Sequence, residues 1–95
     1  MALITPEDYL ELERAAETKS EYYLGEMLAM ARVSLVHTII VVNIGSELHN
    51  QLSERDCTVH ISAARLAVTS DEFYTYPDVM VIRGKPVFID AHLDT

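Results

Sequence analysis

Residues 76–83 read Tyr-Pro-Asp-Val-Met-Val-Ile-Arg, and this stretch decides the class of the fold. Its side chains alternate between the two faces of a strand, with Val79 and Val81 on one face and Asp78, Met80 and Ile82 on the other. Pro77 has no amide donor, so it belongs at the start of a strand or on a sheet edge. The pattern predicts a strand from Tyr76 to Arg83.

The residues upstream continue the same period of two. Thr58 to Val68 is predicted as a strand, bent near Ala63-Ala64. The polar run of residues 69–72 then predicts a turn before the strand that begins at Tyr76.

A long helix is predicted before these strands. Ser34 is its N-cap and it reaches roughly Glu54. Apolar residues recur at four-residue spacing and predict one apolar helical face: Val36, Ile40, Ile44, Leu48 and Leu52, with Ile39 alongside. The β-branched residues 39–42 would suit a strand on propensity alone, but the length and the sustained period favour the helix. Gly45 costs about 1 kcal/mol relative to Ala, which close packing against a sheet offsets.

The first thirty residues predict a short helix and a hairpin. Thr5 as N-cap and Pro6 at the first helical position start a helix that runs to about Ala16 or Glu17. Its buried side is predicted to hold Tyr9, Leu10, and Leu12 or the neighbours of Glu13. Glu21 to Ala31 contains two apolar-aromatic runs separated by Gly25-Glu26, which suit two strands with a tight turn, or one strand with a glycine bulge.

The order helix, hairpin, helix and strands predicts an α+β fold with helices packed on a mainly antiparallel mixed sheet. With 95 residues, the chain accommodates one hydrophobic core, so residues 1–95 are predicted to form a single domain.

The composition excludes some classes of function. Seven basic and fifteen acidic residues give a net charge of −8, which disfavours sequence-independent binding to nucleic acid but leaves metal chemistry open. A lone cysteine, Cys57, indicates a reducing compartment, and the first residues lack the features of a signal peptide. We expect a cytoplasmic protein.

Four side chains are candidates for chemistry, and each also has an ordinary structural explanation. Asp78 is either a carboxylate within an apolar strand, where it needs a partner or a metal, or a solvated residue at a frayed strand start. Glu21 and Glu26 flank the hairpin, where acids are usually solvated. His37, early in the long helix, is either a ligand or proton-transfer group, or a packing histidine. No zinc motif, phosphate loop or nucleophile elbow is present in the sequence.

An ordered set of short motifs runs through almost the whole chain: Thr5-Pro6-Glu7-Asp8-Tyr9-Leu10, Glu21-Tyr22, Gly25-Glu26, Ala29-Met30-Ala31, Ser34-x-x-His37, Asn43 and Tyr76-Pro77-Asp78-Val79. Together they resemble the N-terminal half of the Uma-type (Uma-two) restriction endonucleases, which belong to the PD-(D/E)XK nuclease superfamily. The resemblance implies a restriction-endonuclease-like fold and hydrolysis of DNA phosphodiester bonds.

The same resemblance implies a set of site residues. Asp78 matches the aspartate of the Pro-Asp motif and would be the central ligand of Mg²⁺, or of Mn²⁺ in its place. Glu21 would supply a further contact to the metal or to its water. Glu26 and His37 match recurring positions of the family as supporting residues. Family members continue past the segment equivalent to residues 93–95 to a second catalytic acid and a lysine, so we expect this chain to be truncated at its C-terminus.

Two functions follow from these expectations. The first is a metal-dependent DNA endonuclease that is incomplete as this chain. The alternative is a non-catalytic, truncated paralogue that acts as an interaction module or remnant. A sheet without its next strand would expose an apolar edge, so we expect a homodimer or a missing C-terminal half to cover it.

Overall fold

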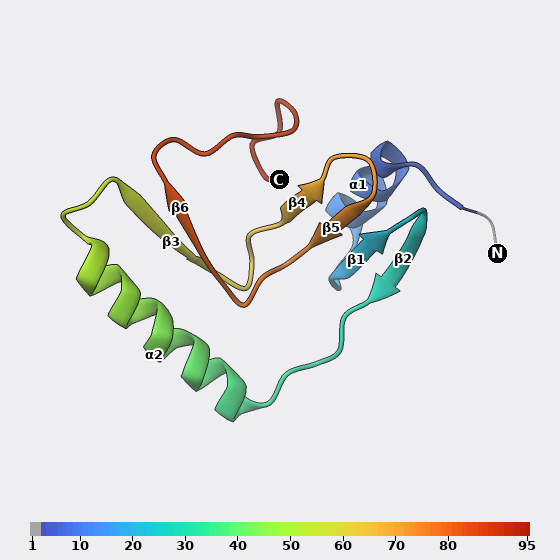
Figure 1. Ribbon diagram of the computed structural model, residues 1–95. Helices are drawn as coiled ribbons and strands as arrows, with labels where there is room; N and C mark the ends of the chain where they lie inside the picture. The colour runs from blue at the N-terminus through green and yellow to red at the C-terminus, as the bar shows by residue number, and fades with distance from the viewer. Residues whose placement is uncertain (1–2) are drawn as a thin grey trace.

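The computed structural model describes residues 3–95 and has the α+β architecture that the sequence predicts (Figure 1). The elements follow one another in the order α1 Pro6–Ala15, β1 Ser20–Tyr23, β2 Glu26–Ala29, α2 Leu35–Leu52, β3 Cys57–Ile61, β4 Leu66–Thr69, β5 Phe73–Thr75 and β6 Val79–Arg83. The strands form two antiparallel sheets: sheet A, in the order β2-β1-β5-β4, and sheet B, which pairs β3 with β6. In Figure 1, α1 lies beside sheet A and α2 runs along sheet B.

Helix α1 begins as predicted. The hydroxyl of Thr5 accepts a hydrogen bond from the amide of Asp8 at 3.1 Å, and Pro6 occupies the first turn. The buried face holds Tyr9, Leu10 and Glu13, whereas Leu12 is 52% exposed. The prediction that Leu12 would be buried is therefore wrong, because the helix places its acid at 13, one turn after Tyr9 and Leu10, against the sheet.

The hairpin takes the first of its two predicted forms, two strands joined by a tight turn. Leu24 and Gly25 occupy the turn with φ of 47° and 90°. Two consecutive positive φ values match the right-handed twist of the flanking strands and favour glycine at the second position. Across the hairpin Tyr23 pairs with Glu26 and Glu21 with Leu28.

Tyrosine rings form the core between α1 and sheet A. Tyr9, Tyr22 and Tyr74 are each at most 2% exposed, and their ring centroids lie 5.1 to 5.8 Å apart in tilted or edge-on arrangements. Leu10 completes this buried cluster. Each buried hydroxyl donates to a main-chain carbonyl: Tyr9 to Ser20, Tyr22 to Ile4 and Tyr74 to Ser70. The core therefore satisfies the polar end of every ring that it buries.

Helix α2 forms over nearly the predicted range, with Ser34 as its cap. The predicted apolar face packs only in part, because Leu48 and Leu52 are half-buried and its other members are not. Val36, Ile40 and Ile44 are 65%, 51% and 48% exposed, while Val41 and Gly45 are buried. The helix is apolar on several sides, so the four-residue spacing could not identify the packed face. Sheet B instead takes the side on which Gly45 permits a close approach.

One predicted strand is divided in the structure, and another begins later than predicted. The predicted strand from Thr58 to Val68 becomes β3 and β4, which belong to different sheets, because the chain turns at Ser62 with a φ of 48°. The predicted strand from Tyr76 begins only at Val79, because Pro77 cannot donate to a ladder. The residues just upstream of Tyr76 form β5, which the sequence did not predict as a strand.

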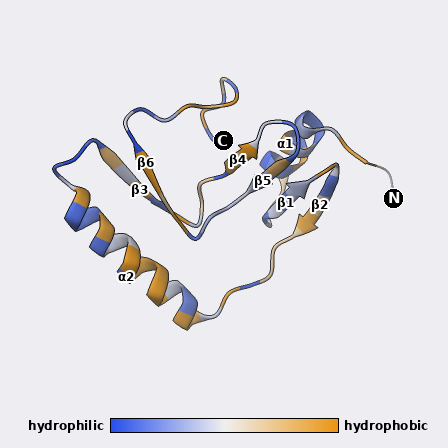
Figure 2. Ribbon diagram, viewed as in Figure 1, coloured by the Kyte–Doolittle hydropathy of each residue, from blue (hydrophilic) through white to orange (hydrophobic). Residues whose placement is uncertain are grey.

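Figure 2 shows hydrophobic residues, in orange, along the length of α2. Within residues 3–95, none of the helices combines the length and apolar character needed to cross a membrane.

Candidate functional site

Asp78 lies at the junction between the two sheets. It falls in the connection from β5 to β6, directly before the first residue of β6, and its side chain is 59% exposed. Its main-chain carbonyl accepts a hydrogen bond from the amide of Ser62 at 3.0 Å, in the connection from β3 to β4. The crossing of these two connections fixes the backbone of Asp78 while its carboxylate faces solvent.

His37 is brought to Asp78 by α2. Its Nε2 lies 3.2 Å from Oδ1 of Asp78. The same nitrogen is buried and has no hydrogen bond of good geometry among the described residues. Ser34 positions this side chain because its hydroxyl caps the helix on the amide of His37 at 3.1 Å. The first turn of α2 thus brings a buried imidazole nitrogen within ion-pair distance of a carboxylate.

Glu21 and Glu26 occupy different places in the hairpin. Glu21, on β1, is half-buried, and its carboxylate accepts a hydrogen bond from the hydroxyl of Thr75 on β5. Thr75 lies three residues before Asp78, so both candidate acids meet the same segment. Glu26 is exposed at the turn end of β2, next to Tyr23. The structure therefore joins His37 to Asp78, ties Glu21 to the strand leading there, and leaves Glu26 at the far end of the hairpin.

A buried polar network lies beside this segment, and it was not predicted from the sequence. Glu13, Arg65 and Tyr76 are 6%, 9% and 8% exposed. The hydroxyl of Tyr76 donates to Oε2 of Glu13 and accepts from Nη1 of Arg65 at 3.1 Å. Burial, together with the hydrogen bond to the Glu13 carboxylate, raises the pKa of Tyr76. The one feature of the sequence that pointed to this network is Glu13, an acid on the apolar face of α1.

The network extends to the C-terminal segment, residues 84–95. Nε and Nη2 of Arg65 contact Thr95 at 2.8 Å and Asp94 at 2.9 Å. Arg14 of α1 holds the same Asp94 through two hydrogen bonds of 2.8 and 2.9 Å. Arg14, followed by Arg65, keeps the pKa of Asp94 well below its usual range.

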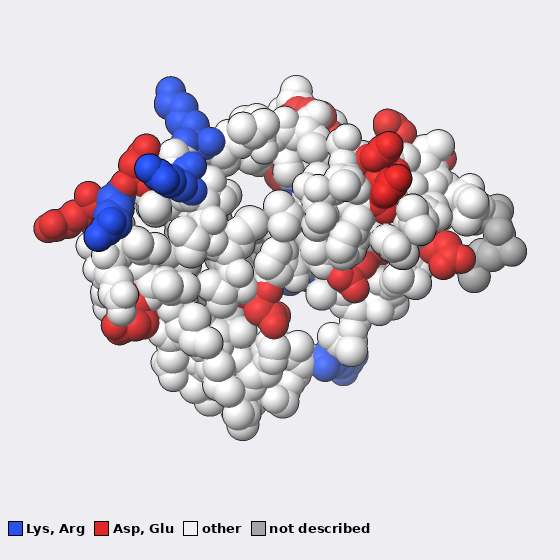
Figure 3. Space-filling view, in the orientation of Figure 1, with Lys and Arg blue, Asp and Glu red and all other residues white. Residues whose placement is uncertain are grey.

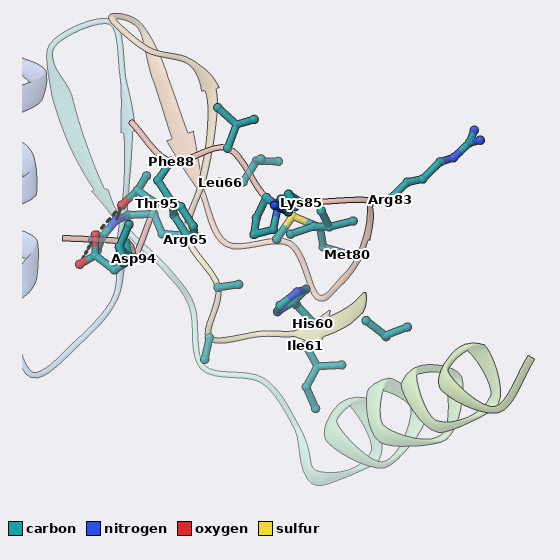
Figure 4. Close-up of a pocket in the computed structure, with 17 residues that line it drawn as sticks. His60, Ile61, Arg65, Leu66, Met80, Arg83, Lys85, Phe88, Asp94 and Thr95 are labelled. Atoms are coloured by element: carbon teal, nitrogen blue, oxygen red, sulfur yellow. Dashed lines mark hydrogen bonds and ion pairs between the residues drawn. The ribbon is translucent and has the colours of Figure 1, made fainter. Parts of the chain in front are cut away.

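A largely apolar groove opens between sheet B and the C-terminal segment, with a volume of about 870 Å³. Figure 4 shows Met80, Leu66 and Phe88 around this space, the cluster of Arg65, Asp94 and Thr95 at one end, and Arg83 directed away from it. Figure 3 shows the molecule hollowed in this region, with lysines and arginines gathered on the left of the view and acids spread more widely. Asp78 and His37 are not among the residues that line the groove.

The donor atoms at the junction fit a divalent cation only in part. One carboxylate oxygen and one imidazole nitrogen lie together, and residues 3–95 contain no group of three or more His, Cys, Asp or Glu side chains placed to hold a metal. Mg²⁺ usually takes one or two carboxylates and fills its other positions with water and phosphate oxygens. Asp78 can serve as such a ligand, with His37 beside it.

Comparisons with known proteins find one family and two relatives that are similar to this chain. Residues 6–94 match the Uma2 family, whose description is "Putative restriction endonuclease". The chain is 35% identical over 88 residues to the uncharacterized protein sll1609 of Synechocystis, covering 93% of this chain and 50% of that protein. It is 33% identical over 78 residues to the uncharacterized protein slr1290 of the same organism, covering 82% and 41%. The chain thus spans about half the length of these curated relatives, or less. No solved structure shows a significant match.

Proposed function

Because this chain belongs to the Uma2 restriction endonuclease family, we propose that the protein hydrolyses DNA phosphodiester bonds with the help of a divalent metal ion. Within the molecule, the observation that carries the proposal is the approach of His37 Nε2 to Asp78 Oδ1 at 3.2 Å. An exposed carboxylate on a fixed backbone, with an imidazole beside it, suits metal and phosphate chemistry.

The residues of this chain take separate roles in the proposal. Asp78 is the central metal ligand, with Mg²⁺ as the physiological ion and Mn²⁺ as a substitute. Such an ion, when bound, supplies polarisation of the phosphodiester and activation of a water. His37 orients the Asp78 carboxylate or accepts a proton from that water. Glu21, held by Thr75, contributes from the neighbouring strand, and Glu26 has no contact that gives it a part.

Charge explains why a metal is needed for this substrate. The chain has a net charge of −8, which repels a phosphate backbone. A divalent ion on Asp78 reverses the local field at the point where the phosphodiester must approach. We place this reaction in the cytoplasm, where DNA and Mg²⁺ meet.

The first test is a calorimetric titration of the folded chain with Mn²⁺. We expect the parent to bind, and Asp78→Ala to weaken the affinity at least 10-fold, since even partners in the outer shell of a metal commonly contribute about that much. Asp71→Ala is the matched control because Asp71 is an exposed aspartate in the turn between β4 and β5. We expect this control to bind like the parent.

The alternative function is a non-catalytic interaction module, and the exposed apolar side of α2 favours it. Absence of Mn²⁺ binding in a folded parent would reject the metal site and favour this module. Binding that depends on Asp78 would instead justify an assay of Mg²⁺-dependent cleavage on double-stranded DNA.

A further inference from the structure

Tyr76 stands between the buried network and the candidate metal ligand. It follows directly after β5, and only Pro77 separates it from Asp78. Its ring is buried, at 8% exposed, while the Asp78 side chain two residues later is 59% exposed. The chain therefore passes from a fixed interior point to a solvent-facing carboxylate within two residues.

Two oppositely charged groups hold the Tyr76 hydroxyl. Glu13 of α1 accepts a hydrogen bond from it, and Arg65 donates to its oxygen at 3.1 Å. Both partners are themselves fixed. The amide of Ser20 donates to the Glu13 carboxylate at 2.9 Å, and Arg65 donates to Thr95 at 2.8 Å. A hydroxyl with both a charged acceptor and a charged donor has little rotational freedom.

The link from Tyr76 to Asp78 is short and stiff. Pro77 locks φ near −65° in the one intervening residue. Lys19 adds a second fixed point, because its Nζ lies 5.3 Å from the centroid of the Tyr76 ring and donates to the carbonyl of Ser62 at 2.7 Å. The amide of the same Ser62 holds the carbonyl of Asp78 at 3.0 Å. Lys19 and Ser62 thus connect the Tyr76 ring at one end of the link to the Asp78 carbonyl at the other.

We propose that Tyr76 is a positioning residue for the Asp78 carboxylate, with Glu13 and Arg65 as the groups that hold it. The inference rests on the proposed function, because it assumes that Asp78 binds a metal. Tyr76 does not touch the metal or the substrate. Its contribution is to place the backbone of Asp78 so that the carboxylate meets His37 and an incoming cation in one arrangement.

The test removes only the hydroxyl, with Tyr76→Phe, and measures Mn²⁺ affinity by calorimetry. We expect a loss of about 10-fold, the usual range for a partner that orients a ligand. The matched control is Tyr74→Phe, which removes another buried hydroxyl, from β5, whose bond runs to Ser70 and away from Asp78. We expect this control to lose stability but to keep the Mn²⁺ affinity of the parent.

A conservative variant separates orientation from charge. Glu13→Gln keeps an oxygen that can accept from Tyr76, so we expect Mn²⁺ affinity within about twofold of the parent, whereas Glu13→Ala should resemble Tyr76→Phe. Equal affinities in the parent, Tyr76→Phe and Glu13→Ala, with Asp78→Ala still impaired, would overturn the positioning role and leave the proposed function intact. A folded parent that binds no Mn²⁺ would overturn both.

One further test uses only the parent chain, so it does not require any variant to fold. Nuclear magnetic relaxation should show the amide of Asp78 as ordered as that of Tyr74, with an order parameter of about 0.85. A value below about 0.6 at Asp78, with Tyr74 rigid, would contradict the inference even if Tyr76→Phe could not be purified in folded form.

Discussion

Gly45 is a point of close approach between α2 and sheet B. A Cβ built at this position would lie 2.9 Å from Cγ2 of Ile61 on β3. That methyl belongs to a β-branched side chain with restricted rotamers, so it cannot move aside freely. The glycine is therefore retained for contact between helix and sheet, although it lowers the intrinsic stability of the helix.

Gly45→Ala should destabilise the chain by roughly 1 kcal/mol, because an overpacking cost of about 1–3 kcal/mol exceeds the helical gain of about 0.5–1 kcal/mol. Urea denaturation measures the difference. Removing the obstructing methyl should reverse the sign, so that Gly45→Ala becomes stabilising in an Ile61→Ala background. The exposed neighbour Ser46 serves as control: Ser46→Ala should be neutral or slightly stabilising. The same penalty in both backgrounds would refute the steric explanation.

Residue patterns predicted the starts of both helices and the hairpin turn. Thr5 and Ser34 cap the two helices through the bonds that their positions imply, and Gly25 lies in the hairpin turn. These are local effects, which depend only on neighbours in sequence. The burial of Glu13 was not predicted, because its partner Tyr76 lies far along the chain and an acid on the apolar face of α1 is a weak signal by itself.

At the scale of elements, α1 and the C-terminal segment are joined by charge. Arg14 contacts Asp94 and Asp90, at 2.8 and 3.0 Å, and Arg65 contacts Asp94 at 2.9 Å. Arg14 and Arg65 lower the pKa of Asp94 below that of an aspartate in an unfolded chain. The unfolded chain consequently binds more protons than the folded chain as the solution becomes acidic, and stability falls with falling pH.

Asp94→Asn should test this linkage through the pH dependence of unfolding. Above about pH 4, where aspartate is charged even when unfolded, the parent should be more stable than the variant. The difference should shrink as the pH falls through the lowered pKa of the folded state. Urea unfolding at pH 7, 4 and 2.5 measures it. The exposed Asp71→Asn is the control and should show no such trend; a parallel trend in both variants would argue against the arginine contacts.

Strand pairing was harder to predict than strand character. The residues of β3, β4 and β6 alternate as the sequence indicated, and Val79 and Val81 share a face opposite Ile61 and Val59. The assignment of β3 and β4 to separate sheets depends on the turn at Ser62. This residue has a positive φ but is not a glycine, so the turn could not be predicted from the sequence. A period of two gives the faces of a strand but not its neighbour.

At the scale of the whole molecule, α2 exposes a large apolar surface to solvent. Several large residues of α2 are at least 48% exposed: Leu35, Val36, Ile39, Ile40, Val42 and Ile44. Contiguous apolar surface of this kind promotes association in water, while the net charge of −8 opposes contact between other parts of the surface. If copies associate, we expect the contact to be helix against helix.

Sedimentation velocity should detect self-association of the chain that increases with concentration. Ile40→Lys should shift the distribution toward monomer, because it places a charge in the middle of the apolar side of α2. Ser46→Lys adds the same charge to the same helix at a polar position and should leave association unchanged. A parent that sediments as a monomer at all concentrations would contradict the expectation.

The structure brings some of the candidate residues together, and their roles stay predictions. The sequence indicated Asp78, Glu21, Glu26 and His37, and the structure places His37 against Asp78 and ties Glu21 to Thr75. Exposed Glu26 gained no contact of this kind. The distances between these residues depend on how α2 and the two sheets are packed, and a single sequence carries that information only weakly.

The order in which the strands are made has a consequence for synthesis on the ribosome. Sheet A takes β1 and β2 from the start of the chain and β4 and β5 from beyond β3, so the two sheets alternate along the sequence. Tyr9 and Tyr22 emerge early, but the ring that completes their core, Tyr74, is translated late. The apolar surfaces of the hairpin and of α2 therefore stay exposed on the nascent chain until β5 is synthesised. A chaperone would bind these surfaces during that period.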